Sequence, residues 1–369
     1  MINFLIASTT MFRSPQLSFL GGGVAAHVYA LVAAEVWPSE LSDVTMIDPL
    51  AAAPDRTLCV WGAPLPALQP AIVAEWSSLR FGYKTETFTC ELGDWTYRQY
   101  TAASIREHAN SKLTIRRIVG SASDPITEDV LTLDSRPAPP VEHQATVSLL
   151  QHFRGRRIRT SVPTFTPDTA VMMDFRTDQR DGVCFVYVLP YSEYEALVEC
   201  TAFTEEPWFA AAYDRRLDAY IDEIIGCTTY DVIATEEGII PMNDHRARRW
   251  RGPNWITIGG VAGLTKPTTG YTVARCARDA DVMFRQLRET GVAAVPASPP
   301  KRFAWYDVLL LRIIRDEPQV VPRILWTLFR RNPIRRILRF LDEQTSLREE
   351  IALFWTLPWM PFLRAIVRR

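Results

Sequence analysis

Glu199 lies in the middle of a segment that otherwise has the composition of a buried strand. The surrounding residues 185–203 read FVYVLPYSEYEALVECTAF, and the part that begins at Ala196 is short, apolar and rich in β-branched or aromatic residues. Burial of an ionised carboxylate without a partner costs several kcal/mol. Glu199 therefore either points to solvent from a sheet edge or is buried as a proton donor with a raised pKa. From the pattern alone, the solvent-facing position is the commoner of the two.

The other side chains that could do chemistry do not form a recognisable centre. Asp174 and Asp178 stand near Arg176, and a structural salt bridge is their expected role. The six cysteines are far apart and include no CxxC pair, which indicates buried thiols in a reducing compartment. The five histidines show neither HxH nor HxxxH spacing, so the sequence predicts no metal site.

A glycine-rich turn near the N-terminus has the spacing of a dinucleotide-binding loop. LSFL predicts a short apolar strand, and after it Gly21, Gly23 and Ala26 satisfy the pattern G-x-G-x-x-G/A. Residues 27–36 then have a helical pattern, and VTMID predicts a second strand that ends in Asp48. The glycines would let the backbone approach a pyrophosphate at the helix N-terminus, and the acid is placed to bind a ribose hydroxyl. The alternative is an ordinary glycine-rich turn. An acid at this position disfavours a 2′-phosphate, and FAD and NAD both remain open.

A second glycine loop precedes another helix. Residues 255–291, WITIGGVAGLTKPTTGYTVARCARDADVMFRQLRETG, predict a strand, a loop rich in Gly, Thr and Pro, and a long helix. This loop could contact a phosphate or the polar edge of a flavin, and a simple β-to-α turn explains it nearly as well. Between the two loops, residues 141 to about 205 read as antiparallel-like strands, 209–225 as an amphipathic helix, and 230–242 as a further strand.

The length and charge of the chain limit the possible partners. A chain of 369 residues suits two or three domains, and a formal net charge of −1 gives no broad attraction to nucleic acid. The charge is unevenly spread, because residues 301–369 hold 14 Lys and Arg against 7 Asp and Glu, a net charge of +7. This asymmetry points to a membrane or another acidic partner for the C-terminal segment.

The C-terminal segment reads as amphipathic helices. NPIRRILRFLDEQ, residues 332–344, places apolar residues on one side and arginines on the other, and the last 21 residues set aromatic side chains beside arginines. That combination suits a helix lying in the headgroup layer of a membrane, although packing onto the rest of the protein is the commoner use of such a face. No run of eighteen uncharged apolar residues occurs, so the sequence predicts no transmembrane helix, and residues 1–14 are expected to form a disordered leader.

Eight short stretches occur in a defined order along nearly the whole chain. They are LGGGVAA (20–26), DRTLCVW (55–61), QHFRGRRI (151–158), MDFRTDQ (173–179), FVYVLPYSEYEALVECT (185–201), EEGIIPM (236–242), GLTKPTTGYT (263–272) and RNPIRRILRFLDEQTSL (331–347). In order and spacing, this series resembles the bacterial-type lycopene cyclases of carotenoid biosynthesis. Two departures are a first strand, LSFL, that is shorter and less apolar than the family's, and Ala262 in place of an expected glycine.

The resemblance implies an α/β (α+β) fold like that of the FAD-containing hydroxylases. A Rossmann-like FAD-binding domain would be interleaved with an antiparallel β-sheet substrate domain and followed by a C-terminal helical segment. The expected ranges are 15–60, 101–140 and 226–292 for the FAD-binding domain, 61–100 and 141–225 for the substrate domain, and 301–369 for a basic, membrane-proximal helical segment.

The resemblance also implies a chemistry. The family uses reduced FAD, with NAD(P)H as reductant, and cyclises the ψ end groups of lycopene or a related acyclic carotene to β-rings without net redox change, so the enzyme would be an isomerase (an intramolecular lyase). The family's essential acid corresponds to Glu199, which reverses the preference for a solvent-facing position. The second loop would lie beside the flavin with Gly263, Lys266, Pro267, Thr269, Gly270 and Tyr271.

The expected location is the cytoplasmic face of a membrane, without nucleic acid or metal as partners. Two alternatives remain open beside the cyclase. An FAD-dependent monooxygenase of an apolar substrate would share the fold and the first glycine loop, and its product would gain oxygen. A non-catalytic carotenoid- or flavin-binding protein would bind pigment without converting it and would tolerate the loss of Glu199.

Overall fold

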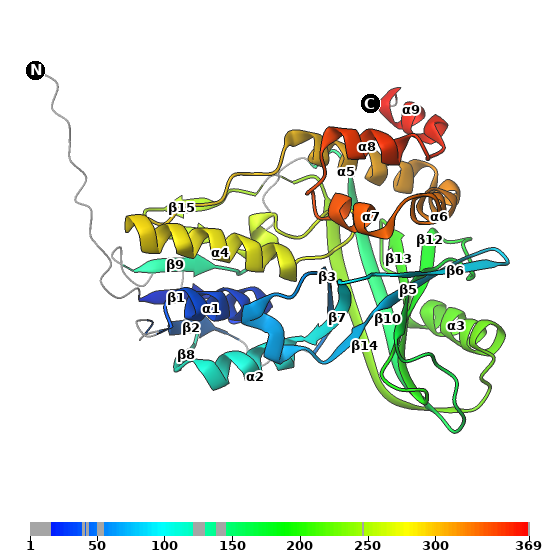
Figure 1. Ribbon diagram of the computed structural model, residues 1–369, viewed down its shortest axis with the longest axis horizontal. Coiled ribbons are helices and arrows are strands. Elements are labelled where there is room, and N and C mark those ends of the chain that lie inside the picture. The colour runs from blue at the N-terminus through cyan, green and yellow to red at the C-terminus, as the bar shows by residue number, and fades with distance from the viewer. Residues whose placement is uncertain are drawn as a thin grey trace, which may run out of the picture.

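The computed structural model describes residues 16–38, 41, 44–49, 55–120, 130–137, 145–245 and 247–367. The predicted leader, 1–14, lies outside the described residues. The described residues form three sheets, with helices around the first and a group of helices from the C-terminal segment against the second (Figure 1).

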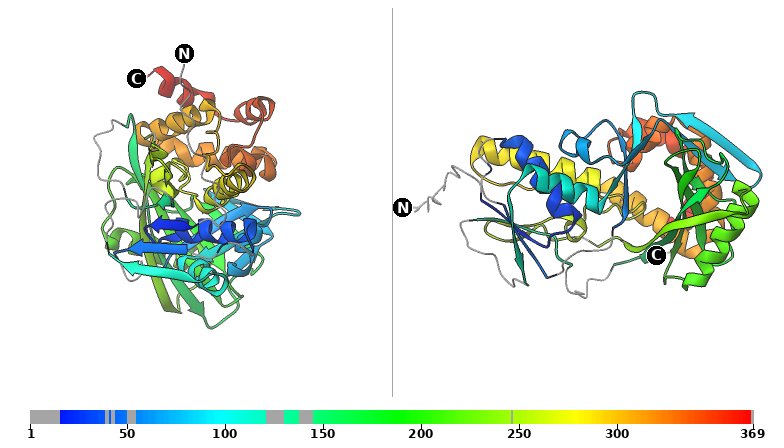
Figure 2. Two further views of the ribbon diagram at one scale, coloured as in Figure 1. Left: turned by 90° about the vertical axis from the view of Figure 1, so that its left-hand side faces the viewer. Right: turned by 90° about the horizontal axis from the view of Figure 1, so that it is seen from below.

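A mostly parallel sheet holds the first glycine loop. Its strand order is β15-β16-β9-β1-β2-β8, and every neighbouring pair is parallel except β15 with β16. Helix α1 (Val24–Val36) packs against α2 (Ala102–Lys112) and α4 (Val273–Thr290), and the three lie together along this sheet (Figure 2). The strands are β1 (Leu17–Leu20), β2 (Val44–Asp48), β8 (Ile115–Val119), β9 (Leu131–Asp134), β15 (Trp250–Gly252) and β16 (Trp255–Thr257). This is the predicted Rossmann-like part of the fold.

The second sheet has seven strands in the order β14-β10-β13-β12-β11-β5-β6 and is antiparallel except where β11 pairs with β5. One face packs against α3 (Ala210–Tyr220) and the π turn Ile221–Ile225, and the other face packs against the C-terminal helices. The strands are β5 (Ser78–Tyr83), β6 (Glu86–Glu91), β10 (Ser148–Thr160), β11 (Thr169–Asp174), β12 (Val183–Pro190), β13 (Glu195–Thr204) and β14 (Tyr230–Asn243).

Strand β14 corrects one expected boundary. Residues 226–292 are expected to belong to the nucleotide domain, but β14 pairs with β10 along thirteen positions of the antiparallel sheet. The chain therefore returns to the parallel sheet only at β15. The long, strongly paired β10 leaves its second edge open for β14, and this long-range pairing has no local sequence signal.

A small sheet joins the two large ones. It has the order β3-β7-β4, with β3 (Thr57–Gly62), β4 (Ala74–Trp76) and β7 (Thr96–Thr101). Along β3, Val60 belongs to the core of the parallel sheet, whereas Trp61 belongs to the core of the antiparallel sheet. Consecutive residues of a strand point to opposite faces, so this strand contributes to both cores.

The C-terminal segment is helical, as predicted. Its helices are α5 (Lys301–Asp316), α6 (Val321–Arg331), α7 (Ile334–Leu341), α8 (Leu347–Phe354) and α9 (Trp359–Val367), and a short 3₁₀ turn, Pro318–Val320, lies between α5 and α6. Two further 3₁₀ turns lie earlier in the chain, at Pro66–Ala71 and Gly259–Ala262. The apolar face of α7 is buried in the protein core, so packing is the correct explanation for that helix. Within the described part of the chain, no single helix is long and apolar enough to cross a membrane, and α8 and α9 reach that length and composition only as a pair bent by 109°.

Candidate functional site

A cavity of about 420 Å³ lies where the parallel, small and antiparallel sheets meet. Its wall includes the start of α1, the beginning of β3, the end of the second glycine loop and the inner face of β10, β12, β13 and β14. Among the predicted site residues, the structure brings together Gly23, Thr269, Gly270, Tyr271 and Glu199 on this one wall. These residues lie up to 248 positions apart in the chain, so only the fold makes them neighbours.

The first glycine loop is shaped to accept a ligand. The backbone N–H of Gly22 donates a hydrogen bond to Asp48 Oδ2 at 2.9 Å, which ties the loop to the end of β2. Gly21 has a φ of 91°, a left-handed conformation that favours glycine. A Cβ added to Gly23 would meet no atom within 4 Å, and this residue precedes α1, whose first N–H groups face the same opening. Ala26 is buried beneath the loop in the helix core.

Two buried polar atoms on the cavity wall lack a partner among the described residues. They are Gln151 Oε1 on β10 and Thr269 Oγ1 in the second glycine loop. Gly270, with a φ of 73°, brings the loop so close to β10 that an added Cβ would lie 2.9 Å from Gln151 Oε1. A buried polar atom without a partner is costly, so these atoms indicate a polar ligand. Together with the open glycine loop, they fit a dinucleotide flavin.

Lys266 has a different position from the one that the resemblance implies. Its ammonium group is buried and donates to both oxygens of Asp307, at 2.8 and 2.9 Å, and to Glu343 at 3.1 Å. Thr268 also donates to Asp307, at 2.8 Å. This side chain therefore fastens the second glycine loop to the C-terminal helices, and it lies outside the cavity lining, as do Gly263 and Pro267.

Glu199 is on an interior strand. Strand β13 lies between β10 and β12, and Glu199 is directly opposite Gly155 on one side and Tyr187 on the other. Glu199 is partly buried, and its accessible surface belongs to the cavity wall, so the position at a sheet edge is wrong.

Burial raises the pKa of Glu199 well above its ordinary value. Repulsion by the nearby Glu236 carboxylate and a hydrogen bond with it raise the pKa further, and a hydrogen bond from Thr201, which donates to Oε1 at 3.0 Å, partly offsets the shift. Burial and the neighbouring carboxylate thus both favour the protonated form of Glu199, which is the form that a general acid needs.

Aromatic side chains surround the carboxyl group. Tyr187 lies beside Glu199 on β12, and the hydroxyl groups of Tyr97 and Tyr271 are 2.8 Å apart. The ring of Tyr271 lies 4.2 Å, centroid to centroid, from the ring of Trp61. Such a wall offers apolar surface and π faces that attract cations. Sequence reasoning missed Gln151, although it stands in the QHFRGRRI stretch.

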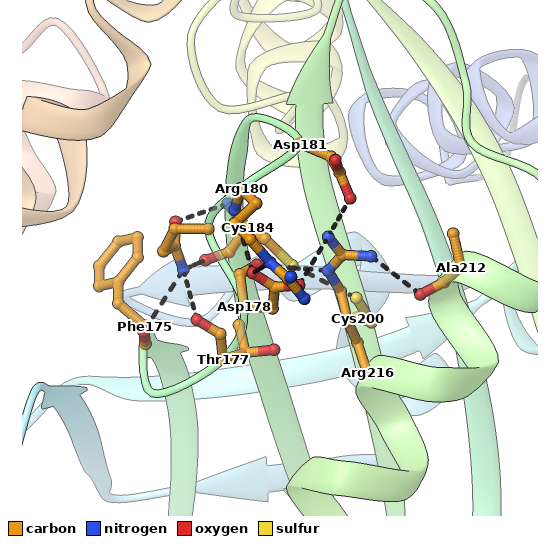
Figure 3. Close-up of polar contacts among 10 residues, drawn as sticks. Phe175, Thr177, Asp178, Arg180, Asp181, Cys184, Cys200, Ala212 and Arg216 are labelled. Carbon is orange, nitrogen blue, oxygen red and sulfur yellow. Dashed lines mark hydrogen bonds and ion pairs between the residues drawn. The ribbon is translucent and has the colours of Figure 1, made fainter.

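A separate polar cluster lies on the opposite face of the sheet, next to α3 (Figure 3). Arg216 donates to the carbonyl oxygens of Asp178 and Ala212 and pairs with Asp181 at 2.6 Å. The sulfur atoms of Cys184 and Cys200, both free thiols, are 3.4 Å apart there. The cluster fixes the β11–β12 turn to the helix.

The predicted salt bridges in this region are confirmed. Arg176 pairs with Asp174 at 2.7 Å, and Arg180 and Arg216 both pair with Asp178. Within the residues that the structure describes, no three His, Cys, Asp or Glu side chains are grouped as a metal site.

Comparison with known proteins identifies sequence relatives. A family model described as lycopene cyclase protein matches residues 92–367. A lycopene beta-cyclase of Paracoccus sp. (strain N81106 / MBIC 01143) is 29% identical over 263 residues, which are 63% of this chain and 62% of the relative. A lycopene beta-cyclase of Pantoea ananas is 28% identical over 36% of this chain and 35% of its own length. The matched stretches thus span less than two thirds of these relatives.

Solved structures share the fold at low sequence identity. A geranylgeranyl bacteriochlorophyll reductase-like protein from Thermoplasma acidophilum has a TM-score of 0.55 and 14% identity over 96% of both chains. A flavin-dependent brominase has a TM-score of 0.56 and 11% identity over 96% of this chain and 98% of its own. A flavoprotein/dehydrogenase from Cytophaga hutchinsonii has a TM-score of 0.57, with the same identity and coverage. The predicted fold class is confirmed.

Proposed function

The chain belongs to the lycopene cyclase family, and we propose that it closes the ψ end groups of lycopene, or of a related acyclic carotene, into β-rings without net redox change. The observation that carries this proposal is the position of Glu199. This carboxyl group, whose pKa burial raises, lies on the aromatic wall of the same cavity that the first glycine loop lines.

The reaction starts with a proton transfer. The terminal C=C bond of a polyene offers no lone pair, so its protonation needs a strong acid in a dry site. Glu199 supplies the proton, Thr201 orients its Oε1, and the surrounding tyrosines exclude water. The neighbouring double bond then closes a six-membered ring on the cation, and loss of a proton gives the β-ring. The substrate and product are isomers.

We propose that the cofactor of this site is FAD, reduced by NAD(P)H. The N-terminal N–H groups of α1 would face the pyrophosphate of FAD. Asp48 would hydrogen-bond to the ribose or would position the first glycine loop beside it through its hydrogen bond with Gly22. Gln151 and Thr269 would hydrogen-bond to its polar edge. When bound, the reduced flavin supplies negative charge that stabilises a nearby cation.

Gly23→Val tests this cofactor site. The backbone of Gly23, with a φ of −77°, accepts a valine, so the protein should fold, but the new side chain would stand where the pyrophosphate must lie. We expect less than about a tenth of the wild-type flavin content, read from the absorbance of the purified protein after incubation with FAD. Gly252→Val is the control, because a Cβ there would meet only Trp255, at 3.9 Å. Equal flavin in both variants would contradict this site.

We propose that α8 and α9 contact the membrane that holds the carotene. The helix pair exposes a group of large apolar side chains, which are Leu347, Ile351, Trp355, Trp359, Met360, Leu363, Ile366 and Val367. Trp355 alone is 89% exposed, which is unusual for tryptophan. The net charge of +7 on residues 301–369 adds attraction to anionic lipid.

Replacement of both Trp355 and Trp359 by alanine should weaken binding to anionic vesicles by about ten-fold or more, because two tryptophan rings would no longer enter the interface. Co-sedimentation with vesicles at low and high salt measures the effect. The matched control is Trp250→Ala, which removes a 39% exposed tryptophan from β15, far from α9 (Figure 1). Unchanged sedimentation of the double variant would exclude these helices as the membrane contact.

Expression in lycopene-accumulating cells, followed by pigment chromatography and mass measurement, tests the function. The proposal predicts cyclic carotene with the mass of lycopene. A product with added oxygen would instead indicate a monooxygenase, and bound but unconverted lycopene would indicate a carrier.

A further inference from the structure

Two glutamates flank a single glycine in the antiparallel sheet. Gly155 on β10 is directly opposite Glu199 on β13 and, at its other side, directly opposite Glu236 on β14. Residues that are directly opposite in a sheet point to the same face, so both carboxyl side chains project on one face with no side chain between them. Two strand spacings separate their Cα atoms by about 10 Å, a gap that two glutamate side chains can close.

Only one oxygen of the Glu236 carboxyl group, Oε2, accepts hydrogen bonds from Thr57. The N–H and hydroxyl groups of Thr57 on β3 donate to Glu236 Oε2 at 3.0 and 2.9 Å, and Gln99 donates to the Thr57 hydroxyl oxygen at 3.0 Å. Oε1 of Glu236 is buried, and no N–H or O–H group of the described residues donates a hydrogen bond to it. A carboxylate oxygen in that position needs a donor, and a proton on Glu199 provides one.

Gly155 makes this arrangement possible. A Cβ at this position would lie 3.0 Å from Leu197 Cδ1 and 3.2 and 3.4 Å from the Cβ and Cγ of Glu199. Any larger residue would therefore displace Glu199 and stand between the two carboxyl groups. The backbone of Gly155 is not in the left-handed region, so its conformation alone does not require glycine.

We propose that Glu236 is a positioning residue that shares one proton with Glu199 and keeps Glu199 protonated until the substrate takes that proton. This inference rests on the proposed cyclase function. In the transfer, the O–H bond of Glu199 breaks and a C–H bond forms from the π electron pair of the alkene. When the ring cation later releases a proton, the pair regains one, so nothing is oxidised or reduced.

Of the charged neighbours of Glu199, Glu236 raises its pKa the most. Burial raises the pKa of Cys59 and of Tyr191 to about 12, and it also raises the pKa of Tyr187, so these groups are neutral near pH 7. Thr201 and Thr57 contribute hydroxyl groups. Among the described residues, the other titratable or charged side chains that line this part of the cavity are Arg56, Tyr97 and Tyr271.

Glu236→Gln tests the proposal through the pH dependence of cyclisation. Glutamine keeps an oxygen for Thr57, but it does not repel the ionised form of Glu199, and its amide can donate to that form. The pKa of Glu199 should therefore fall. Because the active form of Glu199 is protonated, the pH at which the cyclisation rate falls should decrease by at least about one unit. At pH values above this fall, the variant should therefore be about ten-fold slower than the wild type. The rate on the acidic plateau should stay close to wild type.

Two further variants sharpen this test. Gly155→Ala should move the alkaline limb in the same direction, since its methyl group separates the pair. Glu237→Gln is the matched control, because Glu237 adjoins Glu236 but is 72% exposed and pairs with Arg154, and its profile should superimpose on wild type. An unmoved limb for Glu236→Gln, or a loss of rate at every pH, would overturn the proposal.

Infrared spectroscopy separates this inference from the cyclase function. The wild type should show the carbonyl band of a protonated carboxyl group that is missing in Glu199→Gln and that ionises at lower pH in Glu236→Gln. This readout needs no substrate. If the wild type made no cyclic carotene but showed these bands, the proposed cyclase function would be contradicted and the shared proton would still be supported. A band in Glu236→Gln that ionises at the wild-type pH would contradict the shared proton.

Discussion

Glu199→Gln is expected to fold, to retain flavin and to lose lycopene cyclisation by a factor of about 10²–10⁴, the usual cost of removing a positioned general acid. We expect the loss at the upper end of this range, because water in an apolar cavity is a poor acid toward an alkene. Glutamine keeps the shape of the side chain and accepts the hydrogen bond from Thr201, but it has no acidic proton. Lycopene consumption under reducing conditions, with flavin content measured in the same sample, gives the result.

Two variants serve as comparisons for this result. Glu195→Gln makes the same change on the same strand, where Glu195 pairs with Arg157 and Arg159, and it should leave the cyclisation rate nearly unchanged. Glu199→Asp should also be impaired, because its carboxyl group is drawn back by one methylene from the reacting carbon. A Glu199→Gln protein that cyclised lycopene at a near wild-type rate would exclude Glu199 as the proton donor.

Asp307→Ala is expected to lower the free energy of unfolding by about 3–5 kcal/mol, because it removes one partner of a buried ion pair. Lys266 is 4% exposed, and after the change its ammonium group would keep only Glu343 as an acidic partner among those it now contacts. The second glycine loop would also lose the contact of Thr268 with α5. Urea unfolding followed by tryptophan fluorescence measures the change.

The matched comparison is Asp281→Ala on α4. Asp281 forms an exposed pair with Arg285 one helical turn away, and such pairs contribute about 0.3–0.5 kcal/mol. The large difference between the two variants is the expected result. If Asp307→Ala unfolded at the same urea concentration as Asp281→Ala, the buried ion cluster would not be what fastens the loop to the C-terminal helices.

Local patterns predicted the elements that carry the site. A short apolar run rich in β-branched and aromatic residues identified the strand around Glu199, and the spacing of Gly21 and Gly23 before a helical pattern identified the first loop. The family resemblance supplied the choice between a buried and an exposed Glu199, because strand periodicity does not say which sheet face is covered. The structure shows the covering elements, namely β3, the second glycine loop and the C-terminal helices.

Long-range pairing accounts for what the sequence did not predict. Glu236 reaches Glu199 only because β14 joins the sheet beside β10, and no local pattern specifies that neighbour. Lys266 stands in a loop whose composition suits a cofactor, but its partner Asp307 lies 41 residues further along, on a helix whose docking direction is set by packing. Burial of α7 and exposure of α9 likewise follow from tertiary contacts, since both helices have amphipathic patterns.

Cyclisation in D₂O tests the central claim most directly. Purified protein, loaded with FAD and kept reduced, is given lycopene in D₂O, and the product is analysed by mass spectrometry. The proposed mechanism predicts one deuterium for each ring formed, because the carboxyl proton of Glu199 exchanges with solvent before it is transferred, and it predicts that Glu199→Gln forms the labelled product at least about 10² times more slowly. A cyclic product without deuterium, or a labelled product formed by Glu199→Gln at a near wild-type rate, would contradict proton donation by Glu199.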